Sequence, residues 1–217
     1  MVMEAQNLWR KQLRVVPDDV WEQANTRILI LAENHLTEIS SRIGGLQNLH
    51  TLDLGHNQLA TVPEETGDIR ELRDFLYLHD NQLESLPAAL GQLQKLRYLN
   101  ISENRFAGFP ECICSMSNLV ELRATDNKLS DLPDSIGNLS RLRELHVRNN
   151  ALRTLPAEIA NLSELRQIDL RENPIEYLPD SLLFLPKLEK IDLRWVTTLT
   201  ASAWLDTLED RGCLIYR

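Results

Sequence analysis

Three cysteines are the side chains of this 217-residue sequence best suited to covalent chemistry. Cys112 and Cys114 form a Cys-x-Cys pair, and Cys213 lies near the C-terminus. One such pair supplies too few ligands for a closed zinc site, and no pattern of histidine or acid marks Cys213 as a nucleophile. We therefore expect Cys112 and Cys114 to be two small, semi-buried residues rather than a zinc or redox site. An odd number of cysteines does not build a disulfide framework, which favours a reducing compartment.

His56, His79 and Asp80 are a second group with the residue types of a metal site. Two imidazoles and one carboxylate are few ligands for zinc, and the two histidines do not occupy equivalent positions of the sequence repeat. We expect ordinary surface histidines, no metal and no cofactor. The sequence contains neither a phosphate-binding Gly-x-x-x-x-Gly-Lys loop nor His-Glu-x-x-His, and no set of nucleophile and base stands out, so no enzymatic activity is predicted.

A repeat of 23 residues organises the chain. Leucine occurs 41 times in 217 residues, and asparagine recurs at intervals of 23 or 24 residues. The recurring asparagines are Asn34, Asn57, Asn81, Asn104, Asn127, Asn150 and Asn173. Residues 142–156 read L-x-x-L-x-V-x-x-N-x-L-x-x-L-P, and the other copies follow the same frame with one single-residue irregularity. Such self-similarity is typical of a repeat architecture.

The pattern resembles the leucine-rich repeat family in its short class with Leu-Pro in the return segment, and is similar to stand-alone bacterial or intracellular members. The resemblance extends from about Leu8 to Leu208. It implies an α/β solenoid. This is a leucine-rich repeat horseshoe with a parallel concave β-sheet and a convex side of loops or 3₁₀ turns.

The residues support this architecture on their own. Leu52-Asp53-Leu54 alternates apolar and polar side chains as a half-buried strand does. Nine such segments are predicted, centred near Asn7, Ile30, Asp53, Tyr77, Asn100, Arg123, His146, Asp169 and Asp192. The extra residue between Leu72 and Leu76 predicts a bulge or widened turn at Arg73 to Phe75. The repeated asparagine is expected to be buried and to pair backbone groups where each strand turns.

We predict a single domain over residues 1–217. Its parts are a degenerate N-terminal capping repeat (1–25), the repeats (26–195) and a C-terminal cap with a short helix (196–217). Trp21 is expected to close the first end. The C-terminal helix is predicted to begin after an N-cap at Ser202 and to end at Gly212, with Trp204, Leu205 and Leu208 against the last repeat.

Composition narrows the class of partner. Lys and Arg number 23 against 32 Asp and Glu, a net charge of −9, which argues against a nucleic-acid or anionic-membrane binder. No apolar run approaches the roughly 20 residues of a membrane span, and no signal peptide is evident. We expect a cytoplasmic, non-catalytic scaffold for protein–protein interaction, monomeric or weakly oligomeric. The alternative is a secreted bacterial effector or virulence factor that binds a host protein.

The outward strand positions of a solenoid form one continuous concave surface, where we expect a protein partner to bind. The predicted partner-binding residues are Phe75, Tyr77, His79, Tyr98, Arg123, His146, Arg148, Arg171 and Arg194. The aromatic residues either anchor a partner or cover one another. The arginine column is either a salt-bridge lattice or a clamp for a partner's anionic groups. An acidic row at the loop edge favours a basic partner, or serves solubility: Glu33, Asp80, Glu103, Asp126 and Glu172.

Overall fold

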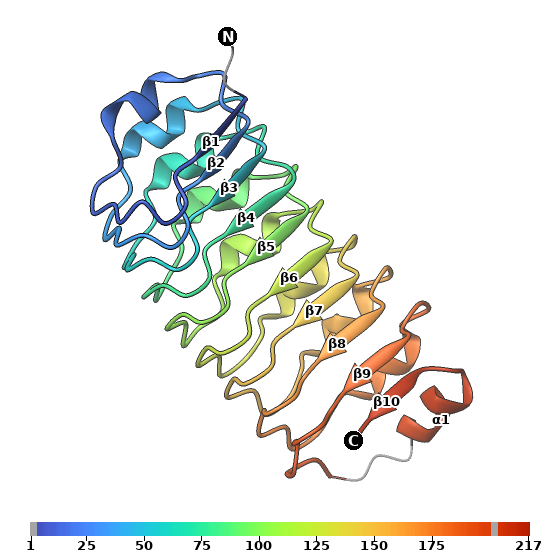
Figure 1. Cartoon of the computed structure of the whole chain (residues 1–217). Helices are drawn as coiled ribbons and strands as arrows, with labels where there is room; N and C mark the ends of the chain where they lie inside the picture. The colour runs from blue at the N-terminus through green and yellow to red at the C-terminus, as the bar shows by residue number, and fades with distance from the viewer. Residues whose placement is uncertain (1–3, 201–203) are drawn as a thin grey trace.

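The structure of the protein, a computed structural model, describes residues 4–200 and 204–217. Ten parallel strands form one open sheet in chain order, and short 3₁₀ turns occupy the opposite side (Figure 1). The strands are β1 (Ala5–Asn7), β2 (Ile28–Ile30), β3 (Thr51–Asp53), β4 (Phe75–Tyr77), β5 (Tyr98–Asn100), β6 (Glu121–Arg123), β7 (Glu144–His146), β8 (Gln167–Asp169), β9 (Lys190–Asp192) and β10 (Leu214–Tyr216). The predicted solenoid is confirmed.

A 3₁₀ helix follows each of the first eight strands, and a proline precedes seven of these helices. The 3₁₀ helices are η1 (Asp18–Glu22), η2 (Ser41–Gly45), η3 (Glu64–Asp68), η4 (Ala88–Gln92), η5 (Glu111–Ser115), η6 (Asp134–Asn138), η7 (Ala157–Asn161) and η8 (Asp180–Phe184). Proline suits this place because its missing N–H is not needed there and its fixed φ starts the turn.

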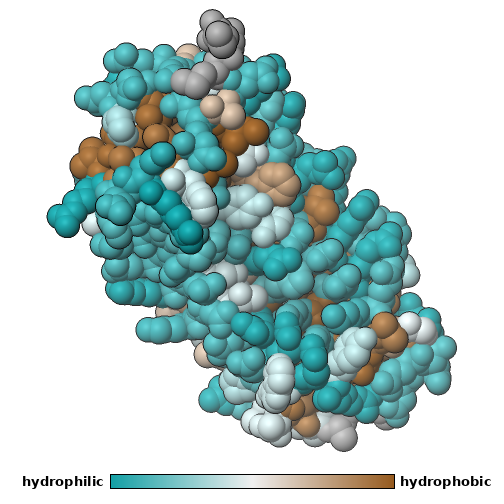
Figure 2. Space-filling view, viewed as in Figure 1, coloured by the Kyte–Doolittle hydropathy of each residue, from teal (hydrophilic) through white to brown (hydrophobic). Residues whose placement is uncertain are grey.

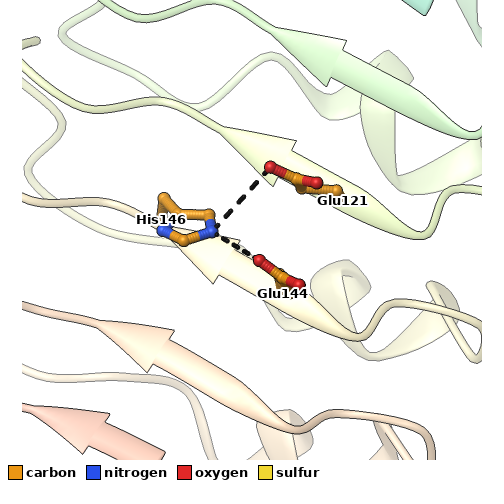
Figure 3. Close-up of side chains that lie close together, drawn as sticks. All are labelled: Glu121, Glu144 and His146. Atoms are coloured by element: carbon orange, nitrogen blue, oxygen red, sulfur yellow. Dashed lines mark hydrogen bonds and ion pairs between the residues drawn. The ribbon is translucent and has the colours of Figure 1, made fainter.

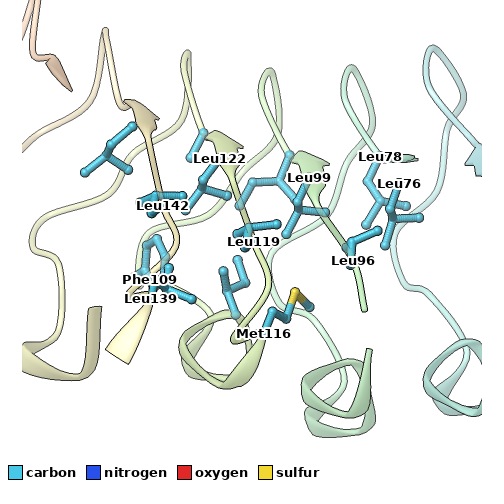
Figure 4. Packing of buried hydrophobic residues seen from close by; sticks show 14 of the residues in the cluster. Leu76, Leu78, Leu96, Leu99, Phe109, Met116, Leu119, Leu122, Leu139 and Leu142 are labelled. Atoms are coloured by element: carbon cyan, nitrogen blue, oxygen red, sulfur yellow. The ribbon is translucent and has the colours of Figure 1, made fainter. Parts of the chain in front are cut away.

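The sheet register aligns equivalent positions of successive repeats. Leu52 pairs with Leu29 on one side and Leu76 on the other, and all three side chains are fully buried. The nine predicted strands are present, each centred one residue earlier than expected. Their inward leucines stack into columns, part of which Figure 4 shows. Burying one such side chain is worth about 1.5–3 kcal/mol, so the columns are the main source of stability.

The tenth strand was not predicted, because Leu-Ile-Tyr at residues 214–216 lacks the leucine spacing of the repeat. β10 pairs with β9, with Ile215 opposite Ile191. It follows α1 (Trp204–Asp210), whose Leu205 and Leu208 are buried. The chain leaves the helix through Gly212, which has a φ of 90°. The predicted N-cap, Ser202, lies outside the described residues.

The first repeat of the chain, in and just before η1, supplies buried side chains at the N-terminal end of the solenoid. Val16, Val20 and Trp21 are buried there, and Trp21 is 7% exposed. One cluster of buried apolar residues extends from Val16 to Cys213. Within the described ranges, no helix has the length and apolar character needed to cross a membrane.

The extra residue of the fourth repeat is accommodated just before β4. The N–H groups of Arg73 and Asp74 both donate to the carbonyl of His50, at 3.3 and 2.9 Å. Phe75 is already in register with Thr51. The irregularity is therefore confined to Arg73 and Asp74, and the prediction that it includes Phe75 is wrong. The sheet face continues without a break across β3 and β4.

Candidate functional site

A row of asparagine side chains runs inside the solenoid where each strand turns away from the sheet. Asn104 is representative. Its Nδ2 donates to the carbonyls of Leu78, Ile101 and Ser102 at 3.0, 3.1 and 3.0 Å, and its Oδ1 accepts from the N–H of Leu83 at 2.9 Å. Leu78 and Leu83 belong to the preceding repeat, so the side chain ties two repeats together.

All seven predicted asparagines occupy this row with the same bonding pattern, but their burial differs. Asn34, Asn57, Asn81, Asn104 and Asn173 are buried, and Asn127 and Asn150 are half-buried. Asn127 still accepts from the N–H of Phe106 at 3.2 Å and donates to the carbonyl of Ile101 at 3.0 Å. The row is a structural element of the fold, because its side chains pair backbone groups of successive repeats.

The residue before each of these asparagines has a left-handed backbone. Its φ lies between 49° and 56° at Glu33, His56, Asp80, Glu103, Asp126, Asn149 and Glu172. Trp195, at the equivalent position of the next repeat, has a φ of 63°. This conformation costs a residue with a Cβ roughly 1–2 kcal/mol. The five residues of the predicted acidic row all occupy this tight turn, which His56, Asn149 and Trp195 occupy in other repeats.

Phe75, Tyr77, His79 and Tyr98 form an aromatic cluster on the concave face. The rings of Phe75 and Tyr77 are stacked with centroids 5.7 Å apart, and Tyr98 lies 5.4 and 5.1 Å from them. Burial raises the pKa of Tyr98 to about 12, whereas Phe75 remains 41% exposed. The rings cover one another as aromatic pairs do, yet Phe75 still presents apolar surface to solvent.

His79 lies directly against Gly55 of the preceding repeat. A Cβ at residue 55 would stand 2.3 Å from the His79 ring, so this packing requires glycine. Burial, with a contribution from nearby His56, lowers the pKa of His79, which keeps the ring neutral at neutral pH. His56 lies 4.6 Å from it and approaches Asp80 Oδ2 at 2.6 Å through Nδ1. The histidine pair therefore packs ring against ring.

Two members of the arginine column form ion pairs with the aspartate two residues earlier in the same repeat. Arg171 reaches both oxygens of Asp169 at 2.8 and 2.6 Å, and Arg194 reaches both oxygens of Asp192 at 2.9 and 2.8 Å. Burial raises the pKa of Asp192, but hydrogen bonds from Arg194 and the charges of both arginines outweigh it, and the net pKa is lowered. These forked pairs favour the salt-bridge interpretation of the column.

A hollow of about 280 Å³ lies over β6 to β9 on the concave face. It brings together four predicted residues, Arg123, His146, Arg148 and Arg171, whereas Arg194 does not line it. Arg148 is 3.1 Å from Asp126 and 3.9 Å from Glu172. Figure 2 shows the middle of the molecule as mostly hydrophilic, whereas apolar side chains gather toward the N-terminal end. The aromatic cluster and the hollow adjoin, because Tyr98 pairs with Glu121 of β6.

A second basic region, at the N-terminal ends of the strands, was not predicted. Arg73, Lys95, Arg97, Arg141 and Arg143 line a hollow of about 680 Å³ there. Arg97 and Arg143 directly precede β5 and β7, and neither has an ion-pair partner among residues 4–200 and 204–217. The signal in the sequence is that Arg97 and Arg143 occupy equivalent positions of the repeat, directly before a strand.

The cysteines have the character expected of packed thiols. Cys112 is half-buried, Cys114 and Cys213 are buried, and all three are free. Burial raises the pKa of Cys112 to about 11 and also raises those of Cys114 and Cys213. A nucleophilic cysteine needs the opposite shift.

Three family models match the chain in succession. They describe a leucine-rich repeat region (residues 66–151), a leucine rich repeat (140–195) and two copies of leucine rich repeats (27–65). Together they span residues 27–195 without a gap, which is more than half of the chain. The chain belongs to the leucine-rich repeat family. Domains of this family are in general protein–protein interaction modules, and the matches point to a non-enzymatic role.

Individual relatives cover shorter or larger shares. The volume-regulated anion channel subunit LRRC8E of Homo sapiens is 39% identical over 87 residues, which is 39% of this chain and 11% of that protein. A leucine-rich repeat protein of Leptospira interrogans has a TM-score of 0.64 at 27% identity, covering 95% of this chain and 64% of its own. A plant peptide hormone receptor, RGFR1 in complex with RGF2, has a TM-score of 0.78 at 32% identity. The match covers 88% of this chain and 32% of the receptor chain.

Proposed function

We propose that the chain is a non-catalytic scaffold that binds a protein partner on its concave face. The observation that carries the proposal is the continuity of the aromatic cluster with the hollow over β6 to β9. Tyrosine, tryptophan and arginine are enriched among the few residues that carry most of the binding energy of a protein interface. The family's general role as an interaction module, and the peptide-bound receptor among the similar structures, support it.

The proposed surface has the dimensions of a peptide-sized contact. From β4 to β8 the sheet advances four strand spacings of about 4.8 Å each, or roughly 20 Å. An extended segment of about six residues has that length. Its apolar side chain would lie on Phe75 and Tyr77, and its acidic groups would compete with Asp126 and Glu172 for Arg148.

Affinity capture from source-cell lysate tests this placement with matched variants. Tyr77→Ala and Arg148→Ala should each lose most of the captured partner. Tyr177→Ala and Arg153→Ala are the controls, because Tyr177 is an exposed tyrosine outside the strands and Arg153 pairs with Glu176 of the next repeat. Equal capture by the concave variants and the wild type would refute the placement.

We further propose that the chain acts in the cytoplasm as a monomer or weak oligomer. Its three free, buried or half-buried thiols suit a reducing compartment. Sedimentation velocity at micromolar concentration checks the oligomeric state, with a single species near 25 kDa as the expected result.

A further inference from the structure

Glu121, Glu144 and His146 lie close together at the centre of the concave face. Glu121 of β6 is directly opposite Glu144 of β7 in the sheet register, and His146 follows Glu144 by two residues on the same face. His146 Nε2 is 3.1 Å from Glu144 Oε2 and 4.0 Å from Glu121 Oε1 (Figure 3). One ligand atom of each side chain lies within 4.8 Å of the other two.

This arrangement joins two like charges that neighbouring strands hold side by side. Carboxylates directly opposite each other destabilise a sheet unless something neutralises them. An imidazole nitrogen and two carboxylate oxygens are also the ligand types that zinc prefers, at about 2.0–2.2 Å. Two ligand atoms of a tetrahedral zinc ion stand roughly 3.4 Å apart. This value falls between the 3.1 Å from His146 Nε2 to Glu144 Oε2 and the 4.0 Å from His146 Nε2 to Glu121 Oε1.

The three side chains are held where water competes only in part. Their exposed fractions are 23% for Glu121, 36% for Glu144 and 16% for His146. Each is anchored on a strand that pairs with a neighbour on both sides, so the backbone positions of the three ligands are fixed before an ion arrives.

We infer that Glu121, Glu144 and His146 bind one Zn²⁺ ion on the concave face and leave at least one coordination position open. This goes beyond the proposed scaffold function and does not depend on it, because the isolated chain suffices for binding. It also replaces the expectation from the sequence that no metal is bound. One competitor is present: Arg123 Nε donates to Glu121 Oε1 at 2.6 Å and must turn away when the ion binds.

Calorimetric titration of the full chain with zinc chloride tests the site. We expect one ion per chain, and at least about tenfold weaker binding for Glu144→Gln and for His146→Asn, since even outer-shell changes cost 10–100-fold. His56→Asn is the matched control and should bind as the wild type does. Replacing Cys112 and Cys114 with serine should also leave affinity unchanged. Zinc binding that survives both ligand variants, or that is lost with the cysteines, would overturn the inference.

A gain-of-affinity variant distinguishes coordination from general surface charge. Arg123→Gln frees the Glu121 oxygen and removes a competing positive charge, so zinc should bind more tightly than to the wild type. Unchanged or weaker binding would show that Glu121 is not a ligand, and would overturn the three-residue site. Far-UV circular dichroism of every variant checks that the solenoid is intact.

Discussion

Replacing Asn104 with alanine tests the asparagine row at a position where the lost bonds can be followed one by one. The three carbonyls that Asn104 contacts each keep a second donor: the side chain of Asn81, the side chain of Asn127 and the N–H of Asp80. The buried N–H of Leu83 loses the Asn104 oxygen that accepts from it. An unpaired buried donor costs about 1–3 kcal/mol, so the free energy of unfolding should fall by about 2 kcal/mol.

Urea titration followed by circular dichroism measures this loss. Asn118→Ala is the control, because Asn118 is half-buried and its side chain bonds the carbonyl of Gln94 and the guanidinium of Arg141 in partly exposed positions. Its removal leaves no buried donor unpaired and should cost no more than about 1 kcal/mol. Asn127→Ala should cost less than Asn104→Ala, since Asn127 is half-buried. The reasoning is refuted if Asn104→Ala and Asn118→Ala unfold at the same urea concentration with the same slope.

Three further outcomes follow from packing and charge. Gly67→Ala should destabilise the protein by more than about 1 kcal/mol, because the new Cβ would lie 2.2 Å from the carbonyl oxygen of Ala89. The control is Gly45→Ala, whose new Cβ meets nothing within 4 Å, and thermal melts of the two variants measure the difference. Cys112 should react with a thiol reagent at pH 8 far more slowly in the native state than in urea. The reason is that burial raises its pKa to about 11, so almost no thiolate is present at that pH. Equal reaction rates in the two states would contradict this burial. The pKa of Asp192 is lowered in the folded state, so its carboxylate stabilises the fold above the unfolded pKa near 3.8. That contribution is lost as the pH falls through the folded pKa. The free energy of unfolding of Asp192→Asn should therefore fall less steeply with decreasing pH than that of the wild type.

The sequence predicted most of the fold because one requirement recurs in every repeat. Each Leu-x-Leu must bury its leucines against the neighbouring turn, and that requirement determines strand position, face and parallel order together. β10 lacks this signal, because Ile215 is a strand residue only through its pairing with Ile191. Equally, the extra residue at Asp74 was visible in the spacing, but its confinement to the turn depends on backbone bonds.

The positions of the candidate site residues could be predicted from the sequence, but the hydrogen bonds and ion pairs between their side chains could not. Repeat spacing places Glu121 beside Glu144, yet the spacing does not tell which of them bonds Arg123 and which bonds His146. Those choices depend on side-chain rotamers and on packing across the sheet. For the same reason, the contact of His79 with Gly55 could not be read from either residue alone.

The strictly sequential order of the ten strands has a mechanical consequence. A force applied between the two chain ends loads the nine ladders in series, because each strand is bonded only to the strands before and after it. The molecule should therefore yield turn by turn, starting from whichever end is held more weakly. Each released repeat of 23 residues would increase the distance between the two chain ends by on the order of 75 Å.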